Sequence, residues 1–361
     1  MNIEVWSPTI RRKEMTAVLT ALVDEKIGPG DGAAQFMAFA KERIGFEHCL
    51  ALRSPAIALH QALKILNLSP GDGVLVSGLS PLYYHTVIAG LGLTPVFADV
   101  SESTACIEAE TLEKVREPYK AIVLHHPLGF LTDTALFANT GVPLIEDVST
   151  AFGSFEAVRD DGEGGEEYAG PAEAAANSMN AGKNTAAAFS ILGLEERDMI
   201  TAGGGALIFT GDRRNASVLR NSGGLPSEYA LPDMNAAMAA VQMRECAKNI
   251  EKRRKIADLY HQSALRGRHR LFAARDNFVY NHYAFSVVIE TGMKNVKQYA
   301  AKHGVAVESA FENTLAGAEI APAEACPQCR SLSLRTALFP LYPRLGAKNV
   351  EKVAKVITTL P

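Results

Sequence analysis

Residues 142–153 read VPLIEDVSTAFG and decide the fold class of this chain. The apolar residues 142–145 precede two carboxylates, Glu146 and Asp147, which are followed by small and polar residues. Such a run is typical of a buried strand in an α/β protein, and sheets of this class bind ligands at the carboxyl ends of their strands. The stretch therefore predicts an α/β fold with a ligand site around Asp147.

Similar apolar runs recur on both sides of this stretch, separated by helical patterns. We predict further strands at residues 74–76, 96–98, 121–124, 187–191 and 206–209, and helices at 33–44, 56–67 and 233–262. Short apolar strands separated by helices indicate a mainly parallel sheet that is covered on both faces. Beyond about residue 275 the pattern predicts a smaller α+β unit, with a strand at 283–289 and helices at 293–303 and 347–358.

The length and composition indicate two domains. A chain of 361 residues exceeds what one core usually organises, so we predict a large domain at 1–245 and a small C-terminal domain at 246–361. The net charge of −4 argues against nucleic acid or an anionic membrane surface as a partner. There is no long apolar run and no signal-peptide pattern at the start, and only five cysteines occur, so we expect a cytoplasmic protein without a membrane span.

Two segments have unusual compositions. Residues 156–182 are rich in glycine, glutamate and alanine and lack apolar periodicity, which predicts a long acidic loop. Cys326 and Cys329 form a C-x-x-C motif, but no second cysteine pair or histidine pair stands nearby in the sequence. We interpret both as structural cysteines and predict no metal site.

Motifs spread along the whole chain resemble the DegT/DnrJ/EryC1/StrS family of sugar aminotransferases, which have the pyridoxal-phosphate (PLP) fold type I. The matching segments, in order, are Ile27-Gly28-Pro29-Gly30, Pro95-Val96-Phe97-Ala98-Asp99, His126-Pro127-Leu128-Gly129, Ile145-Glu146-Asp147 with Ala151-Phe152-Gly153, Phe189-Ser190, Gly203-Gly204-Gly205, residues 253–260 and Phe339-Pro340-Leu341-Tyr342-Pro343. The resemblance implies a large domain with a mainly parallel sheet of the seven-stranded type and a small α+β C-terminal domain. It also implies PLP, or its amine form pyridoxamine phosphate (PMP), as cofactor.

The resemblance assigns cofactor positions to particular residues. It implies that Asp147 faces the pyridine nitrogen, because a protonated ring is the electron sink of this chemistry. Ser190, Ser54 and Ala56 align with residues that hold the phosphate, and Thr150 aligns with a glutamine near the phenolic oxygen. The residues implied for the substrate cleft are Tyr83, Tyr84, His85, His126 and Glu228.

The lysine on which the family's chemistry depends is missing. Counting five positions on from Ser190 gives Glu195, and the segment is two residues longer than the family pattern, so Arg197 is the other occupant. Neither side chain forms an imine, since a carboxylate has no amine and a guanidinium stays protonated. Lys183 precedes Ser190 by seven residues and would lie roughly 20 Å from the site at about 3.3 Å per strand residue.

The phosphate-binding residues have changed as well. The family's S-G-T turn is Ser54-Pro55-Ala56 here, and proline has no N–H to donate to a phosphate at a helix N-terminus. The family's N-y-R element, which reaches the cofactor of the neighbouring subunit, is Glu228-Tyr229-Ala230. These losses argue against the binding of PLP or PMP.

Three hypotheses follow from this pattern. The first is a catalytically degenerate homologue, belonging to nucleotide-sugar or surface-polysaccharide metabolism, that binds a sugar-type ligand or a protein partner. The second is a PMP-dependent enzyme resembling the family's sugar dehydratases, with Glu195 as a proton-transfer group. The third is an active PLP aminotransferase whose lysine does not align. Family analogy also predicts a homodimer, and the apolar stripe of Ala236, Ala237, Ala240 and Met243 suits either a dimer interface or an internal core.

Overall fold

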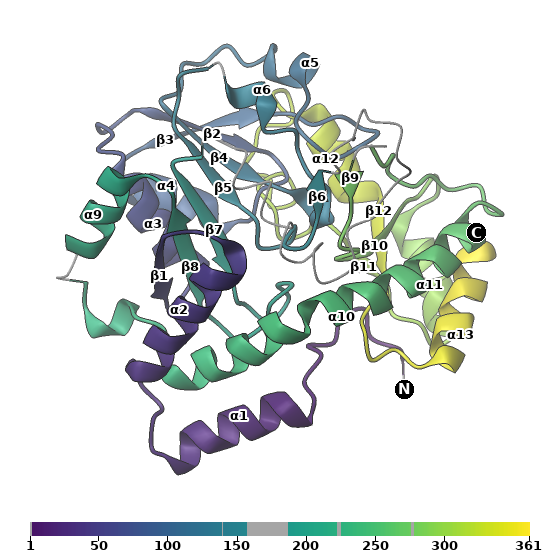
Figure 1. Cartoon of the computed structure of the whole chain (residues 1–361). Helices are drawn as coiled ribbons and strands as arrows, with labels where there is room; N and C mark the ends of the chain where they lie inside the picture. The colour runs from purple at the N-terminus through teal and green to yellow at the C-terminus, as the bar shows by residue number, and fades with distance from the viewer. Residues whose placement is uncertain (1, 139, 157–186, 222–224, 276–277) are drawn as a thin grey trace, which may run out of the picture.

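A seven-stranded sheet forms the centre of the larger part of the molecule (Figure 1). The computed structural model describes residues 2–138, 140–156, 187–221, 225–275 and 278–361. Neighbouring strands from β7 to β3 are parallel, and β8 is antiparallel to both β7 and β1. The order across the sheet is β1 (His48–Leu52), β8 (Ala206–Thr210), β7 (Phe189–Gly193), β5 (Leu144–Asp147), β4 (Ala121–His125), β2 (Gly73–Ser77) and β3 (Thr94–Ala98). The predicted α/β fold with a mainly parallel sheet is confirmed.

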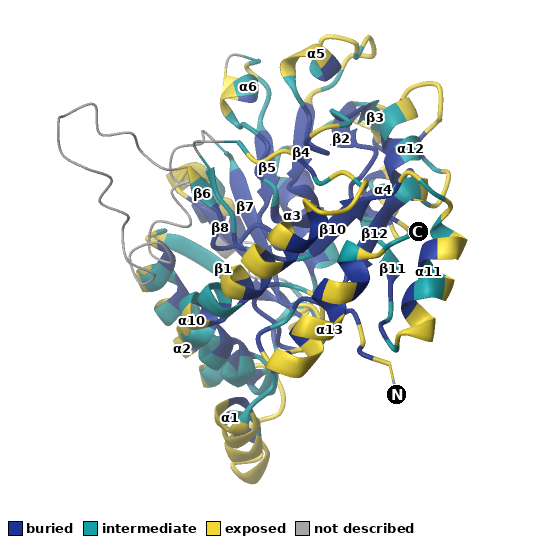
Figure 2. Cartoon of the chain, turned by 90° about the vertical axis from the view of Figure 1, so that its right-hand side faces the viewer, coloured by how far each residue is buried: buried dark blue, intermediate teal, exposed yellow. Residues whose placement is uncertain are grey.

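The central strands are buried on both faces because helices cover the sheet (Figure 2). Every residue of β2, β4, β7 and β8 is buried, which explains their nearly uniform apolar composition. The helix α3 (Pro55–Ile65) packs against β7 and β8, whereas α2 (Asp31–Ile44) packs against β1. The helix α4 (Tyr83–Gly90) packs against α3 and β3. The parallel strands β4 and β5 therefore end at the same edge of a sheet that the helices hold in place.

The observed elements differ from the predicted ones mainly at their ends. The strand predicted at 142–145 is β5, which begins two residues later and continues through Asp147 because Glu146 and Asp147 still pair with β4. The strand predicted at 187–191 is β7, which continues to Gly193 through its pairing with β8. In both strands the pairing with a neighbour continues beyond the apolar residues. β5 therefore ends at the polar Asp147 and β7 at Gly193, next to the site.

A second core lies in the C-terminal part of the chain. Its three-stranded antiparallel sheet has the order β10 (Phe285–Val288), β12 (Thr336–Phe339) and β11 (Glu308–Ser309). The helices predicted at 293–303 and 347–358 are α11 (Met293–Lys302) and α13 (Ala347–Thr358). The helix α10 (Asp233–Ala264) contributes Met243 to the first core and Tyr260 to the second. The predicted boundary between residues 245 and 246 falls inside this helix and stays a prediction.

The remaining described elements are short or peripheral. They are α1 (Arg12–Val23), α5 (Ala109–Leu112), η1 (Pro127–Gly129), α6 (Ala135–Ala138), the paired strands β6 (Phe155–Glu156) and β9 (Phe278–Val279), α9 (Arg213–Asn221), η2 (Ser227–Tyr229) and α12 (Pro327–Arg335). None of the helices in the described ranges has the length and apolar character needed to cross a bilayer. The acidic loop predicted at 156–182 lies outside the described residues, apart from Glu156 at the end of β6.

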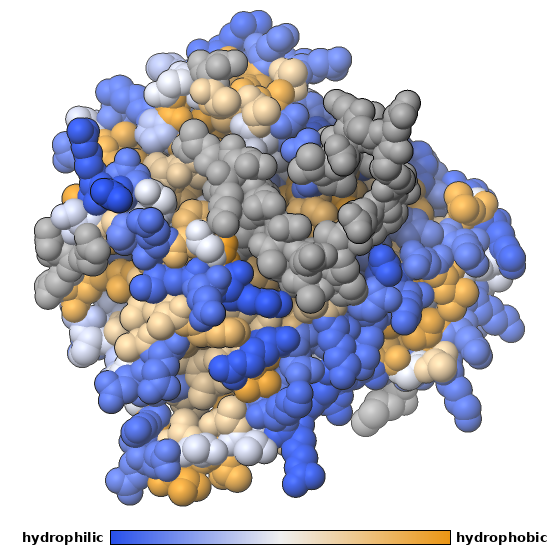
Figure 3. Space-filling model, viewed as in Figure 1, coloured by the Kyte–Doolittle hydropathy of each residue, from blue (hydrophilic) through white to orange (hydrophobic). Residues whose placement is uncertain are grey.

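The helix α1 packs against α10 on one side and carries exposed apolar side chains on the other. Met15, Leu19, Leu22 and Val23 recur at helical spacing and are 57%, 60%, 48% and 73% exposed. Apolar surface is visible at the lower end of the molecule, where α1 lies (Figure 3). In contrast, Ala236 and Met243 of the predicted stripe on α10 are buried within this chain.

The C-x-x-C cysteines lie at the start of α12, beside the end of β3. Cys326 and Cys329 are both fully buried, and Asp99 accepts hydrogen bonds from the backbone N–H groups of Gln328 (3.0 Å) and Cys329 (2.9 Å). The carboxylate therefore caps the helix. Among the described residues, Asp99, Cys326 and Cys329 form the group whose potential metal-ligand atoms lie within 4.8 Å of one another. The absence of a metal stays a prediction.

Candidate functional site

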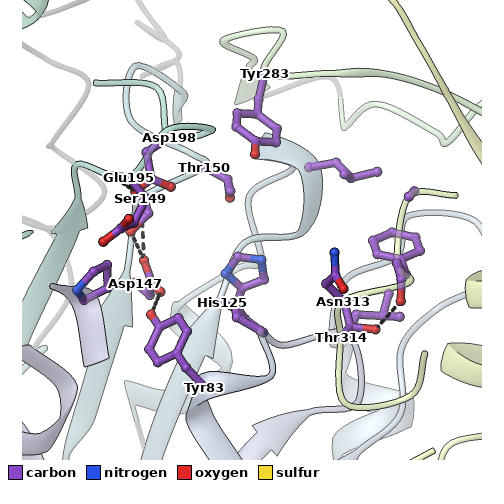
Figure 4. A pocket seen from close by; sticks show the side chains of 16 residues that line it. Tyr83, His125, Asp147, Ser149, Thr150, Glu195, Asp198, Tyr283, Asn313 and Thr314 are labelled. Atoms are coloured by element: carbon purple, nitrogen blue, oxygen red, sulfur yellow. Dashed lines mark hydrogen bonds between the residues drawn. The ribbon is translucent and has the colours of Figure 1, made fainter. Parts of the chain in front are cut away.

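A cavity of about 250 Å³ opens at the carboxyl ends of the parallel strands (Figure 4). One wall comes from the ends of β4 and β5 and from the connection between β7 and β8, which place His125, Asp147, Glu195 and Asp198. The opposite wall is the segment after β11, residues 310–314, from which the amide of Asn313 points inward, whereas the Thr314 hydroxyl turns to the carbonyl of Phe311 (Figure 4). The predicted site around Asp147 therefore coincides with a real cavity at the expected edge of the sheet.

The two cavity walls are joined through backbone contacts. Leu315 N–H donates to the carbonyl of Ser80 over 3.0 Å, and Ala316 N–H donates to the carbonyl of Gly78 over 2.8 Å. Thr314 also forms an isolated β-bridge with Pro81. The segment that follows β2 is thus paired with a segment of the C-terminal part, which encloses the cavity between the edge of the seven-stranded sheet and residues 310–314.

Asp147 is held by donors on both of its oxygens. Oδ2 accepts hydrogen bonds from the phenols of Tyr83 (3.0 Å) and Tyr84 (2.7 Å). Oδ1 accepts from the backbone N–H of Ser149 at 3.0 Å and from the Ser149 hydroxyl. Burial and the neighbouring Asp147 carboxylate raise the pKa of both tyrosines well above the usual range, so they stay protonated donors. The carboxylate is thereby fixed in position by groups of its own chain.

Glu195 reaches the same cavity from the start of the β7–β8 connection, but Arg197 does not. Glu195 lines the cavity, and partial burial raises the pKa of its carboxyl. Arg197 turns away and pairs with Glu308 at 2.7 Å, with its guanidinium 5.4 Å from the centre of the Trp6 ring. The second candidate for the lysine position is therefore outside the cavity, and Lys183 lies outside the described residues.

Asp198 is a cavity residue that the sequence motifs did not indicate. Its Oδ2 accepts a hydrogen bond from Glu195 N–H at 2.8 Å, and the side chain folds back over Gly193. A Cβ at Gly193 would come within 2.2 Å of that oxygen, so only glycine leaves room for it. Burial, followed by the charges of Asp147 and Glu195, raises the pKa of Asp198 to about 7. A carboxyl with such a pKa is poised to exchange protons near neutral pH.

The two consecutive histidines at the end of β4 have different environments. His126 is completely buried, bonded to Glu146 over 3.0 Å and to the N–H of Thr132 over 3.1 Å, and does not line the cavity. His125 does line it, although the motif comparison singled out His126. The Nδ1 of His125 is buried without a hydrogen-bond partner among the described residues, and burial lowers the pKa of the imidazole to about 4. His125 is therefore neutral and has unused hydrogen-bonding capacity.

Of the residues assigned to the phosphate, Ser54 and Ala56 lie at the first turn of α3 and Ser190 lies in β7, and none of the three lines the cavity. Ser54 caps the helix and accepts a hydrogen bond from Ile57 N–H at 3.3 Å. Between Ser54 and Ala56, it is Pro55 that lines the cavity, and its nitrogen has no hydrogen to donate. Ser190 is buried within β7 and is not a lining residue.

The other residues assigned to the cleft are divided between the cavity and its surroundings. Tyr83 and Thr150 line it, and the Thr150 hydroxyl donates to the carbonyl of His126 over 2.6 Å. Tyr84 lies behind Asp147, donates a hydrogen bond to that carboxylate, and packs edge-on against the rings of Tyr83 and His125. His85 on α4 and the exposed Glu228 in η2 are not among the lining residues. The position of Glu228 in the cavity of a neighbouring subunit stays a prediction.

These residues do not fit PLP or PMP. Both oxygens of Asp147 already accept hydrogen bonds, so the carboxylate has no free position facing a pyridine nitrogen. The described lining residues include three carboxylates, Asp147, Glu195 and Asp198, but no lysine or arginine. A phosphate about 4 Å from one carboxylate is disfavoured by about 4 kcal/mol per charge pair at an effective dielectric constant near 20.

The fold itself identifies the class. A seven-stranded sheet with one antiparallel strand, a separate C-terminal sheet and a cavity between them define a PLP-dependent transferase fold of type I. The model of the DegT/DnrJ/EryC1/StrS aminotransferase family matches residues 8–358. The chain therefore belongs to this family, and the resemblance seen in the sequence is confirmed.

Solved structures of similar proteins agree with this assignment over the full length. The aminotransferase TlmJ from Streptoalloteichus hindustanus has a TM-score of 0.82 at 21% identity, covering 99% of this chain and 98% of TlmJ. An aminotransferase from Psychrobacter cryohalolentis has a TM-score of 0.80 at 18% identity, covering 97% and 96%. The E. coli GDP-4-keto-6-deoxy-D-mannose-3-dehydratase with bound hydrated PLP has a TM-score of 0.79 at 15% identity, covering 99% of both chains. At these identities the similarity shows a shared fold.

Proposed function

We propose that this protein is a catalytically degenerate member of its family that binds a sugar-type ligand in the cavity without Schiff-base chemistry. The observation that carries the proposal is the side chain at the lysine position: Glu195 faces the cavity, and the described lining residues provide no amine. The hydrogen bonds to both oxygens of Asp147 and the proline at the phosphate position support the same conclusion.

The remaining lining residues suit a small hydroxylated ligand. Asn313 supplies an amide, Thr150 supplies a hydroxyl oxygen that can still accept a hydrogen bond, and Tyr83 and Phe311 supply aromatic surface. Pockets for small molecules combine apolar walls with a few directed polar groups in this way. With the family membership, these features favour a role in nucleotide-sugar or surface-polysaccharide metabolism, which we assign to the cytoplasm.

A second candidate function is that of a PMP-dependent enzyme similar to the sugar dehydratases of the family. The observation in its favour is Asp198, whose pKa of about 7 suits a group that gives and takes protons near neutral pH. The acidic lining weighs against it, because Glu195 and Asp198 add negative charge to a cavity that an anionic cofactor would have to enter.

The experiment is a titration of the purified wild-type protein with PLP and, separately, with PMP, followed by absorbance and calorimetry. We expect no internal-aldimine band at millimolar PLP, no pyridoxyl-lysine by mass spectrometry after borohydride reduction, and no tight binding of PMP. An adduct on a lysine would overturn the proposal in favour of an active aminotransferase whose lysine does not align. Micromolar binding of PMP without an adduct would favour the dehydratase-like candidate.

A further inference from the structure

A second, smaller cavity shares one wall residue, Asp198, with the first. Its lining comes from the N-terminal residues 6–9, from residues 196–201 of the β7–β8 connection and from the face of α10 around Arg253. The volume of about 20 Å³ is enough for one water molecule or one monatomic ion. The identity of the occupant therefore depends on the charges and hydrogen-bonding groups of the lining.

Arg253 brings a positive charge to this cavity. It is only 9% exposed, and its Nη1 donates to the carbonyls of Tyr283 (2.8 Å) and Leu341 (2.9 Å) and, over 3.4 Å, to that of His282. In the described part of the chain it pairs with no carboxylate. Burial lowers the pKa of the guanidinium to about 10, so it stays protonated at neutral pH. A buried charge without a counter-ion is costly, and a small anion in the cavity would balance it.

Two hydrogen-bonding groups of the same cavity lack partners. The Nε1 of Trp6 and the Oγ1 of Thr9 are buried without a hydrogen-bond partner among the described residues, and both residues line the cavity. Thr9 is only 6% exposed. An indole N–H can only donate, and a hydroxyl can donate as well. Because buried polar groups are nearly always hydrogen-bonded, these two indicate an acceptor from outside the chain.

The other charged groups around the cavity leave this balance in favour of an anion. Arg197 lines the cavity but is already paired with a carboxylate at 2.7 Å. Arg11 adds positive charge nearby, since its Nη2 donates to the wall residue Asn249 over 3.1 Å. The negative groups of the lining are the exposed Glu196 and Asp198. A water molecule would satisfy the donors but leave the charge of Arg253 without a counter-ion.

We propose that the second cavity binds a monatomic anion, chloride in solution, through the indole N–H of Trp6, the hydroxyl of Thr9 and the charge of Arg253. Bromide has the same charge and a similar size, so it should bind at the same place. The site is separate from the cavity of the proposed function and does not depend on that function.

Anion binding should depend on the protonation of Asp198, which is surrounded by groups of both signs. They are the carboxylates of Asp147 and Glu195, the phenols of Tyr83 and Tyr283 and, in the second cavity, Glu196, Arg197 and Arg253. Burial raises the pKa of Asp198 to about 7, so the side chain is mostly neutral at pH 6 and mostly ionised at pH 8. The ionised carboxylate repels an anion. Binding should therefore be tighter at pH 6 than at pH 8, and Asp198→Asn should remove the difference.

The only tryptophan of the chain reports on the site, because Trp6 itself lines the cavity. The test is a fluorescence titration of the full-length protein at pH 6, in which bromide, a heavy halide that quenches indole emission, replaces methanesulfonate at constant ionic strength. Methanesulfonate is polyatomic and too large for this cavity. We expect quenching that saturates and that chloride reverses by competition. Quenching that rises in proportion to bromide, without saturation or competition, would mean that the cavity holds only water and would overturn the proposal.

A matched pair of threonine variants locates the site. Thr9→Val keeps the shape of the side chain and removes a hydroxyl that has no partner in the described residues. It should weaken bromide binding by about tenfold, the loss of one hydrogen bond to a charged group, without lowering stability in methanesulfonate. Thr16→Val, the same change at an exposed position of α1, should leave the affinity unchanged. Equal affinities in the wild type and Thr9→Val would contradict the proposed site.

Thermal unfolding gives a readout that does not use fluorescence. Chloride in place of methanesulfonate should raise the Tm of the wild type at pH 6, because it binds only the folded protein. Trp6→Phe keeps an aromatic ring against Tyr283, whose ring lies 5.0 Å from that of Trp6, but it removes the N–H and should lose this increase. A chloride effect that persists in both Trp6→Phe and Thr9→Val would place the anion elsewhere and overturn the proposal. The PLP and PMP titrations decide separately on the proposed function.

Discussion

Tyr84 donates its phenolic hydrogen to Oδ2 of Asp147 over 2.7 Å, from a position that is completely buried behind the cavity wall. Its neighbour Tyr83 donates to the same oxygen over 3.0 Å from the cavity side. Two consecutive residues at the start of α4 therefore clamp the carboxylate between them. This clamp keeps Asp147 oriented even if no cofactor ever contacts it.

The clamp predicts different costs for two tyrosine substitutions. Tyr84→Phe removes a buried hydrogen bond to a charged group and should lower the free energy of unfolding by about 2 kcal/mol. Tyr299→Phe, which removes an exposed hydrogen bond to Thr359, should lower it by less than about 0.5 kcal/mol. Urea unfolding at pH 7.5 measures both, and equal losses in the two variants would contradict the role assigned to Tyr84.

The raised pKa of Asp198 predicts a particular dependence of stability on pH. The ordinary pKa near 3.8 applies to the unfolded chain, and the folded value is about 7. Between these values the unfolded chain has released the proton that the folded protein retains, so this group lowers stability as the pH rises from 4 to 7, and the loss is complete above pH 7.

Asp198→Asn removes that loss. The variant should be as stable as the wild type near pH 4 and more stable by up to about 4 kcal/mol at pH 8, because the pKa rises by about three units on folding. Urea unfolding of both proteins at several pH values gives the difference directly. A difference that does not change with pH would show that Asp198 keeps an ordinary pKa in the folded protein.

Restoring the lysine should not restore the cofactor. Glu195→Lys supplies an amine, but Pro55 and the carboxylates of Asp147 and Asp198 remain, and each carboxylate within about 4 Å of the phosphate costs about 4 kcal/mol, or roughly a thousandfold in affinity. We expect little or no aldimine absorbance in this variant at millimolar PLP. Adding Pro55→Gly, Ala56→Thr, Glu228→Asn and Ala230→Arg should improve cofactor retention. Tight PLP binding by Glu195→Lys alone would contradict this reading of the cavity.

The two adjacent histidines should respond differently to substitution. His126→Asn removes one partner of the buried pair with Glu146 and the acceptor of Thr132 N–H, so it should destabilise the fold by about 3 kcal/mol. His125→Asn should affect ligand binding more than stability, because Nδ1 has no hydrogen-bond partner to lose in the described part of the chain. Thermal unfolding measures the loss of stability, and calorimetry measures the loss of ligand binding. A large loss of stability in His125→Asn with little in His126→Asn would contradict both assignments.

The homodimer remains a prediction, and α1 offers a way to test it. We expect a dimer at micromolar concentration by light scattering, and Leu19→Glu should produce monomers if the exposed stripe of Met15, Leu19 and Leu22 is covered in the dimer. Thr20→Glu, on the same helix but outside the stripe, should leave the dimer intact. A wild-type monomer would exclude the predicted assembly.

The sheet was predictable from the sequence because its strands are apolar on both faces. In the seven-stranded sheet the predicted strands overlap β2, β3, β4, β5, β7 and β8, whereas β1 was not identified. In the C-terminal sheet, β12 was not identified. β1 lies at the edge of the sheet and begins with His48 and Cys49, so its composition does not mark it as a strand. Strand ends were less predictable because pairing extends into polar residues such as Asp147.

The cavity residues were only partly predictable. The choice between His125 and His126 depends on which face of β4 meets the cavity, and a strand buried on both faces has no polar alternation to reveal it. Asp198 follows Glu195-Glu196-Arg197, a sequence typical of a solvated turn. Its inward position depends on the missing side chain at Gly193, a long-range packing relationship that local sequence patterns do not contain.

The backbone pairing of Leu315 with Ser80 and of Ala316 with Gly78 also sets when the cavity can exist during synthesis. Proteins emerge from the ribosome N-terminus first, at about 5–20 residues per second. The strands that carry His125 and Asp147 are translated well before the segment that closes the cavity. The acidic side chains thus remain open to water until most of the chain has been made, and any ligand that helps residues 310–316 to dock acts only after translation is nearly complete.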